Sequence, residues 1–310
     1  MTLRDRFRRL AAAFAGLLLS TPSLADPQSV PTPVAPSLHE VPSPPVHPAL
    51  WAVRDEDTTI YLFGTIHALR PGVAWFNGPV ERAFAESGTL VTEIADPSGT
   101  DVAQTLLSSA MLPGKESLRG LMSDADRAAY EAALAKAAIP AAGLDRFKPW
   151  YAAVVLSTLP LLRAGFQLDQ GVELQLAARA RDSGKSQEAL ETVAYQLGLF
   201  DSLPRPQQLA YLREVVDNLD AMTGQIDTLI GEWGKGDASG LAKTMNAEEA
   251  DAGLAEILLT RRNKAWAEWI KARLDKPGVV FLAVGAGHLA GPGSVQDQLS
   301  ARGVTSVRLQ

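Results

Sequence analysis

The chain contains no cysteine. Disulfides, thiolate metal sites, a cysteine nucleophile and a lipid-anchored cysteine are therefore all excluded. Histidine is also scarce. Of the four histidines, His39 and His47 lie in a proline-rich segment, so the patterned part of the chain holds only His67 and His288. Any histidine chemistry in the folded part must use these two residues.

The chain has no excess of positive charge, since 35 acidic residues outnumber 29 basic ones and the net charge is −6. This balance, without a basic stripe, argues against a nucleic-acid-binding protein. The compact motifs His-Glu-x-x-His, Gly-x-Ser-x-Gly and the Walker loop are absent as well. A functional site must therefore be assembled from residues that lie far apart in the sequence.

Long hydrophobic runs are missing except near the amino terminus. Residues 1–25 combine four arginines, a short apolar run from Leu10 to Leu19, and Ser23-Leu24-Ala25 as a small-x-small cleavage site. This pattern predicts a signal peptide and a bacterial protein that is periplasmic or secreted, with no stable membrane span after cleavage. A retained anchor is the alternative, but the apolar run is well under the roughly 20 residues that a spanning helix needs.

Residues 26–50 hold eight of the twenty prolines and show no apolar periodicity, which predicts a disordered linker. Residues 51–310 contain no second linker and are interpreted as a single domain. A hydrophobic content of 46% is sufficient for a sizeable core.

One pattern occurs twice, near the two ends of this domain. Gly64-Thr-Ile-His67 follows an apolar run, and Gly285-Ala-Gly-His288 follows another. Each is continued by Pro-Gly at the same offset, a short helical pattern, a glycine and a second β-like run. The repeat favours one shared site over two histidines that are separately satisfied in the core, and such a site suits a metal ion or acid–base chemistry.

The order of the patterns predicts an α/β fold with a mixed or parallel central sheet. A β-hairpin around the polar turn 55–57 starts the domain, and strand–Gly-x-x-His–helix–strand units lie at both ends. The middle of the chain is expected to be a mostly helical insertion. In open α/β sheets, sites form outside the carboxyl ends of the strands.

Three further polar residues are candidates for this site. Glu93 lies near the end of the strand expected over 89–94, and Glu191 follows a short β-like run. Arg262 falls on the apolar side of a helix expected over 254–274, whereas Arg261 falls on its border. A guanidinium there must pair with a buried acid or extend its charged end to solvent.

We expect His67, Glu93 and His288 to be metal ligands. Glu191 is a candidate general base or further ligand, and Arg262 a partner for a carboxylate or a developing oxyanion. Imidazole and carboxylate ligands together suit Mn, Co, Fe or Zn. The alternative is that the two glutamates are buried acids whose purpose is to pair with Arg262.

At these residues the chain resembles the TraB/GumN (TraB–PrgY–GumN) family, which is related to the TIKI metalloproteases. The resemblance covers about residues 50–310 in the family's order. It rests on Tyr61-Leu-Phe-Gly-Thr-Ile-His67, Val91-Thr92-Glu93, Lys148-Pro149-Trp150, Gly171-Val172-Glu173, Leu190-Glu191-Thr192 with Gln196, Arg262-Asn263-x-x-Trp266, and Gly285-Ala-Gly-His288-Leu289.

The resemblance implies an α/β fold in which two Gly-x-x-His motifs, a glutamate and an arginine share one site. It also implies metal-dependent peptide hydrolysis, with Mn or Co favoured and Zn or Fe as further options. Glu173 is a departure, because relatives often carry aspartate there.

Three functions are therefore open. The first is a divalent-metal-dependent, peptidase-like hydrolase. The second is a non-catalytic periplasmic module that binds or senses a peptide or a metal. The third is a metal hydrolase that acts on an ester or lactone. The expected substrate of a hydrolase is a peptide or small molecule, and neither fold nor motif separates the three functions.

Overall fold

The computed structural model describes residues 44–95, 100–246 and 255–310. The expected signal peptide and most of the expected linker lie outside these ranges. The end of that linker is described, and it packs against the domain. The amide of Val46 donates to the carbonyl of Ala74, the amide of His47 donates to that of Gly234, and Pro48 and Ala49 are buried. The packed part of the chain thus begins a few residues before residue 51.

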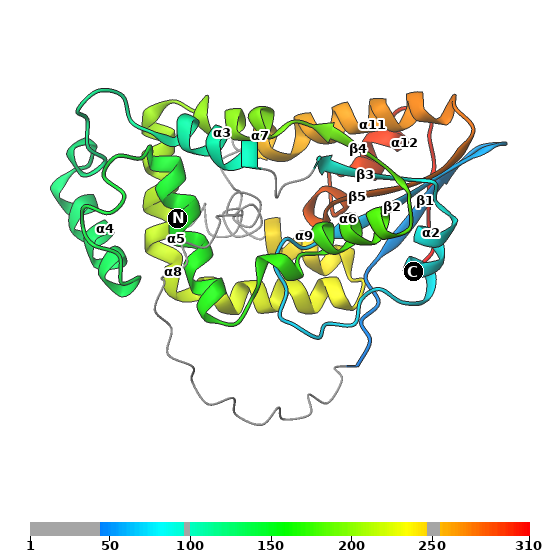
Figure 1. Ribbon diagram of the computed structural model, residues 1–310, viewed down its shortest axis with the longest axis horizontal. Coiled ribbons are helices and arrows are strands. Elements are labelled where there is room, and N and C mark those ends of the chain that lie inside the picture. The colour runs from blue at the N-terminus through cyan, green and yellow to red at the C-terminus, as the bar shows by residue number, and fades with distance from the viewer. Residues whose placement is uncertain (1–43, 96–99, 247–254) are drawn as a thin grey trace.

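The centre of the protein is a six-stranded sheet with the order β4-β3-β5-β2-β1-β6 (Figure 1). The strands are β1 Leu50–Arg54, β2 Thr58–Thr65, β3 Thr89–Ile94, β4 Ser186–Glu191, β5 Gly278–Gly285 and β6 Ser306–Arg308. Strands β4, β3, β5 and β2 are parallel to one another, whereas β1 and β6 are antiparallel additions at one edge. The predicted α/β fold with a mixed sheet is confirmed.

The hairpin that starts the domain is also present. β1 pairs with β2 in antiparallel register, and the turn between them is closed by the Asp55 carboxylate, which accepts the amide of Thr58 at 2.8 Å. β2 then pairs in parallel with β5 so that Thr65 lies opposite Gly285. The two Gly-x-x-His segments therefore leave neighbouring strands at the same level.

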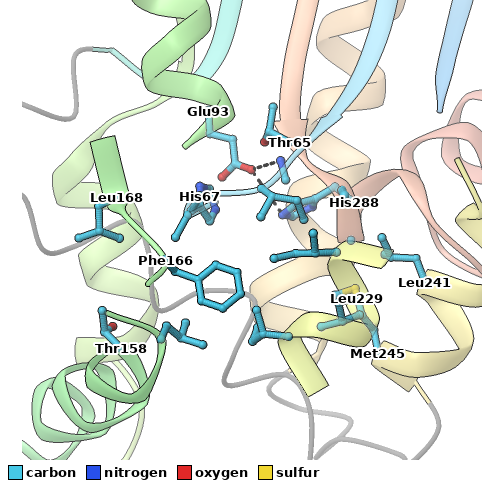
Figure 2. A pocket seen from close by; sticks show the side chains of 18 of the residues that line it. Thr65, His67, Glu93, Thr158, Phe166, Leu168, Leu229, Leu241, Met245 and His288 are labelled. Carbon is cyan, nitrogen blue, oxygen red and sulfur yellow. Dashed lines mark hydrogen bonds and ion pairs between the residues drawn. The ribbon is translucent and has the colours of Figure 1, made fainter. Parts of the chain in front are cut away.

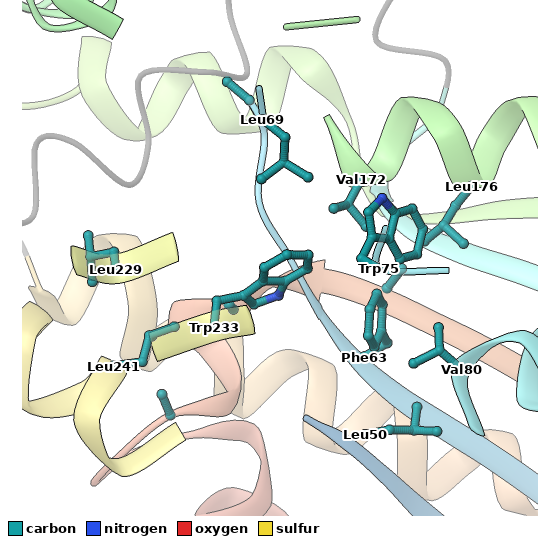
Figure 3. Packing of buried hydrophobic residues seen from close by; sticks show 14 of the residues in the cluster. Leu50, Phe63, Leu69, Trp75, Val80, Val172, Leu176, Leu229, Trp233 and Leu241 are labelled. Atoms are coloured by element: carbon teal, nitrogen blue, oxygen red, sulfur yellow. The ribbon is translucent and has the colours of Figure 1, made fainter. Parts of the chain in front are cut away.

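Both faces of the sheet are covered, because the central strands are apolar on both sides. In β2, Ile60 and Leu62 face helices α11 (Arg261–Leu274) and α12 (Val295–Ser300), while Tyr61 and Phe63 face the opposite layer. Figure 3 shows that second layer, where Phe63 stacks on Trp75 with ring centroids 5.7 Å apart. The result is a sheet between two helical layers.

Helices make up most of the rest of the described chain. They are α2 Gly78–Glu86, α3 Thr100–Ala110, α4 Asp124–Lys136, α5 Pro149–Arg163, α6 Val172–Asp182, α7 Val193–Asp201, α8 Arg205–Gly234, α9 Ala238–Asn246, α11 Arg261–Leu274 and α12 Val295–Ser300. A π-helical segment, η5 Glu256–Thr260, precedes α11, and a 3₁₀ segment, η6 Ala286–Leu289, follows β5.

Helices α3, α4, α5 and α7 and much of α8 form a second apolar cluster beside the sheet, at the left of Figure 1. The 30-residue helix α8 extends from this cluster to the sheet. Gly231 and Gly234 both lie inside α8. At Gly234 a Cβ would lie 3.2 Å from Val46, so here glycine serves close packing. None of the helices described is both long and apolar enough to cross a bilayer.

Candidate active site

The predicted site residues come from one edge of the sheet. Because β4, β3, β5 and β2 are parallel, their carboxyl ends open on the same side. Glu191 is the last residue of β4 and Glu93 is the penultimate residue of β3. His67 lies just beyond β2, and His288 lies in η6 just beyond β5. Figure 2 shows the two histidines and Glu93 directed into one pocket.

Gly285 marks the point where the three side chains meet. A Cβ placed on this glycine would lie 3.2 Å from Glu93 Oε1, 3.6 Å from His288 Cδ2 and 3.9 Å from His67 Nε2. The distance between Glu93 Oε1 and His288 Nε2 is 3.9 Å. The expectation that the duplicated histidines face one pocket, with Glu93 on its wall, is confirmed.

Arg262 is 1% exposed and connects the acidic residues to His288. Its Nε donates to Glu191, and its Nη2 donates to Glu93 at 2.5 Å and to Glu191 at 2.9 Å. Its Nη1 donates to the carbonyl of Leu258 at 3.1 Å and contacts His288 Nε2 at 3.0 Å. A guanidinium has five N–H groups, and each of them has a protein acceptor here. Arg262 is buried as an ion pair, as one of the two sequence interpretations requires.

The protonation of His288 follows from its neighbours. Asn263 Nδ2 donates to the carbonyl of Gly293, so the Oδ1 of Asn263 faces His288 Nδ1 and accepts its proton at 2.6 Å. Arg262 can only donate, so Nε2 of His288 is an acceptor. Burial, and then the nearby guanidinium, lower the pKa of His288 to about 3, which makes the ring neutral at pH 7.

Glu93 is 4% exposed and has partners on both oxygens. Its Oε1 accepts the amide of Gly285 at 2.7 Å, and its Oε2 accepts from Arg262 and from Gln196 Nε2. Burial alone would raise the pKa of Glu93, but the guanidinium of Arg262, the two histidines and the amide of Gly285 together outweigh burial, and the pKa lies well below the usual range. Glu93 is therefore a fixed negative charge.

Glu191 lies on the far side of the guanidinium from the pocket residues. Its oxygens accept from Arg262, from Trp266 Nε1 at 3.0 Å and from Gln196 Nε2 at 2.9 Å. In this arrangement Glu191 anchors Arg262. A role as general base or metal ligand stays a prediction.

His67 has a carboxylate behind it. Glu173, from the first turn of α6, lies 2.8 Å from His67 Nδ1 and also accepts the hydroxyl of Thr65. Burial lowers the pKa of His67, but the Glu173 carboxylate more than offsets it, so the net shift is upward. The opposite ring nitrogen, Nε2, faces the space above Gly285. With its side chain 12% exposed, His67 is a basic imidazole that a ligand in the pocket can reach.

A metal ion held by His67, Glu93 and His288 would need an open lone pair on each residue. His288 does not provide one, because Nδ1 carries a proton and Nε2 accepts from Arg262. Within the described ranges, no group of three or more histidines and acids is arranged to hold a metal ion. The three side chains as they stand do not fit the expected ion, and metal binding stays a prediction.

The sequence analysis gave no role to several residues that hold the site together. Glu173 orients His67, Asn263 sets the tautomer of His288, and Gln196 bridges the two glutamates. Trp266 donates to Glu191, and its ring centroid lies 4.3 Å from that of His288. All four residues belong to the family motifs quoted above, and these motifs are the sequence signal that could have identified them.

Comparison with known proteins identifies the family of the chain. A model of the TraB/PrgY/gumN family matches residues 49–308. The chain is 25% identical over 269 residues to an "Uncharacterized protein" of Treponema pallidum (strain Nichols), which covers 81% of this chain and 80% of the relative. It is 24% identical over 239 residues to "Uncharacterized protein YbaP" of Escherichia coli (strain K12) and, with the same figures, to that of Shigella flexneri, covering 77% of this chain and 87% of each relative. No solved structure matches. With nearly the whole domain matched, the chain belongs to the TraB/PrgY/gumN family.

Proposed function

We propose that this protein is a hydrolase in which His67 is the general base that activates water. The observation that carries the proposal is the His67–Glu173 pair at the polar end of the pocket, with His67 Nε2 turned toward Glu93 and Gly285. An imidazole held by a carboxylate at one nitrogen, with the other nitrogen facing a ligand pocket, is the arrangement that proton abstraction requires.

The proposed reaction is the hydrolysis of an ester or amide. His67 Nε2 takes a proton from water as the water oxygen bonds to the carbonyl carbon. The bond from that carbon to the leaving oxygen or nitrogen then breaks, and the proton on His67 passes to the leaving group. Glu173 stabilises the imidazolium between these steps and holds Nδ1–H in place, which keeps Nε2 available as the acceptor.

The buried ion-pair network supports this chemistry indirectly. Because every N–H of Arg262 already has an acceptor, the guanidinium is not a hydrogen-bond donor to substrate. Its charge still acts through the low-dielectric interior and favours negative charge that develops beside it. Glu93 and Glu191 fix its position and offset part of that field.

Metal-dependent hydrolysis, with His67, Glu93 and His288 as ligands, is the second candidate. The observation that favours it is that His67 Nε2 and Glu93 Oε1 both face the space above Gly285. A bound Mn, Co, Zn or Fe ion would polarise the substrate carbonyl and acidify water. This candidate requires Arg262 to release His288 Nε2, which the first does not.

The test is turnover of a panel of nitrophenyl esters and chromogenic peptide amides by the purified full-length chain. Assays run in chelator, in Mn²⁺ and in Co²⁺. We expect turnover that persists in chelator, falls at least about a hundredfold in His67→Ala, in line with the loss of a general base, and is unchanged in the control His47→Ala, whose histidine is exposed.

Three other outcomes decide between the remaining functions. Turnover only with added Mn²⁺ or Co²⁺ would replace the first candidate with the second. Stoichiometric binding of a peptide or metal without turnover would identify a non-catalytic binding or sensing module. Full activity in His67→Ala would remove the general base from the reaction and overturn the proposal.

Export is part of the proposed function, since residues 1–25 combine a basic start, a short apolar run and Ser23-Leu24-Ala25. We expect cleavage after Ala25 and a periplasmic or secreted protein. Amino-terminal sequencing of the protein from a bacterial envelope checks this, and a retained Met1 in the membrane fraction would contradict it.

A further inference from the structure

The pocket that contains His67 has two chemically different ends (Figure 2). The polar end lies at the sheet edge and holds His67, Glu93 and His288. The other end lies between α5, the segment that follows it, α8 and α9. Its wall consists mainly of apolar side chains, among them Leu161, Phe166, Leu168, Ile226, Leu229 and Met245. A ligand that fills the pocket must therefore be amphipathic.

The apolar end offers few hydrogen-bonding groups. Thr158 is the polar side chain on the α5 side of the wall, and its hydroxyl donates to the carbonyl of Val154 in its own helix. An extended peptide backbone placed there would lose its hydrogen bonds to water, and each buried amide left without a partner costs about 1–3 kcal/mol. A hydrocarbon group loses nothing and gains from burial. The wall therefore favours a hydrocarbon chain or ring over peptide backbone.

The charges at the polar end of the pocket determine which head group the ligand can have. Glu93 lines the polar end, Glu173 lies behind His67 and Glu191 lies behind Arg262, so three carboxylates are balanced by the single guanidinium of Arg262. That guanidinium donates all its N–H groups to the protein, so it cannot pair with a ligand carboxylate. With His67 neutral, as the proposed general base is before it takes a proton, an anionic head group would meet net negative charge and no available cation. The polar end therefore favours a neutral carbonyl.

We propose that the substrate class is a neutral ester or amide whose acyl or alkyl group is a hydrocarbon chain or ring, seated between α5, α8 and α9 with its carbonyl at His67. The space between the side chains that line the pocket is about 860 Å³ when the open mouth of the pocket is included. This inference rests on the proposed hydrolase function for its chemistry, whereas the preference for a neutral apolar ligand is a property of the pocket alone.

The test measures binding separately from turnover. The probe is N-phenyl-1-naphthylamine, a neutral apolar fluorophore, and the competitors at pH 8 are decanamide, butanamide, decanoate and an apolar tetrapeptide amide. We expect decanamide to displace the probe at a concentration at least tenfold lower than decanoate. Affinity should rise about fourfold for each methylene that enters the pocket, the factor that corresponds to burial of one CH₂ group.

Two tryptophan substitutions locate the binding. Leu162 lines the pocket mouth and is 40% exposed, so Leu162→Trp fills the pocket without disturbing the core. Leu107 is a matched control, since it is a 49% exposed leucine on α3 that does not line this pocket. Leu162→Trp should weaken probe binding at least fivefold and Leu107→Trp should leave it unchanged. Ile230→Trp is a second filling variant with the same expected effect, in case the first one misfolds.

Several results would overturn the inference. These are tighter binding of decanoate than of decanamide, no dependence on chain length, better competition by the tetrapeptide amide, or probe binding that both filling variants leave intact. Chain-length-dependent binding without turnover of any ester would support the pocket inference and contradict the hydrolase. Turnover of esters without any chain-length preference would support the hydrolase and contradict the pocket inference.

Discussion

Removal of the Arg262 guanidinium is the strongest single perturbation that the structure predicts. Arg262→Met keeps much of the side-chain volume but leaves Glu93 and Glu191 buried without their cation. Removal of one partner from a buried ion pair costs about 3–5 kcal/mol. For a domain of this size, each kcal/mol lowers the melting temperature by about 2–4 °C, so we expect a decrease of about 6–20 °C.

Arg261→Met is the matched control. Arg261 is the neighbouring residue, its side chain is 66% exposed, and its ion pair with Glu256 spans 3.6 Å. Exposed pairs contribute less than about 1 kcal/mol. Thermal unfolding followed by circular dichroism compares the two variants with the wild type. If Arg262→Met were no less stable than Arg261→Met, the interpretation of Arg262 as the residue that holds the buried acids would be refuted.

The loss of stability predicted for Arg262→Met should depend on pH in one direction. In the wild type the pKa of Glu93 is held below its usual value of 4.5. The ionised Glu93 therefore stabilises the fold above pH 4.5, and this stabilisation is lost as the pH falls through the folded-state pKa of Glu93. In Arg262→Met the largest interaction that opposes burial is removed, so the pKa of Glu93 rises and protonation on acidification relieves the variant. The difference in melting temperature should be largest near pH 7 and smaller at pH 5. A variant that also carries Glu93→Gln and Glu191→Gln should recover at least half of the loss.

Three further predictions concern the residues around the two histidines. Glu173→Gln should lower the pKa of His67 below 6.5, because burial then acts without the carboxylate. In the wild type the raised pKa of His67 stabilises the fold at pH values below the unfolded-state pKa. This stabilisation is lost as the pH rises through the folded-state pKa. Nuclear magnetic resonance of the imidazole measures the shift. Asn263→Ala leaves His288 Nδ1–H without its acceptor and should cost about 1–3 kcal/mol in denaturant unfolding. Gly285→Ala should lower turnover about tenfold or more, because the new methyl displaces the site side chains.

Each of these has a control of the same type. Glu81→Gln removes another carboxylate from the first turn of a helix and should leave the His67 resonance in place. Asn218→Ala removes an amide that bonds only within α8 and should cost less than Asn263→Ala. Gly88→Ala adds a methyl with nothing within 4 Å and should leave turnover unchanged. Equal effects in variant and control would contradict the role assigned to the site residue.

The convergence of His67 and His288 could be predicted because it depends on periodicity and chain direction. Two apolar runs that each end in Gly-x-x-His predict two buried strands, and parallel neighbours end at the same edge. The helical wheel also separated Arg262 from Arg261 correctly, since burial follows the apolar stripe. These are properties that a sequence carries directly.

The partners of Arg262 could not be predicted in the same way. Its five donors are distributed among Glu93, Glu191, Leu258 and His288, and that choice depends on side-chain geometry across strands far apart in the sequence. The metal expectation followed from residue types alone, whereas the tautomer of His288 depends on Asn263. Glu173 was discounted because it differs from relatives, yet its longer side chain places a carboxylate 2.8 Å from His67.

The polar end and the apolar wall of the pocket come from different parts of the chain. The polar end is built at strand termini, where the register of β2, β3 and β5 fixes the reacting groups to one another. The apolar wall comes from α5, which precedes β4, and from α8 and α9, which follow it. Substitutions in those helices can reshape the wall while the strand register, and with it the chemistry, stays constant. The ligands that the pocket accepts can therefore change while the arrangement of the two histidines and Glu93 is preserved.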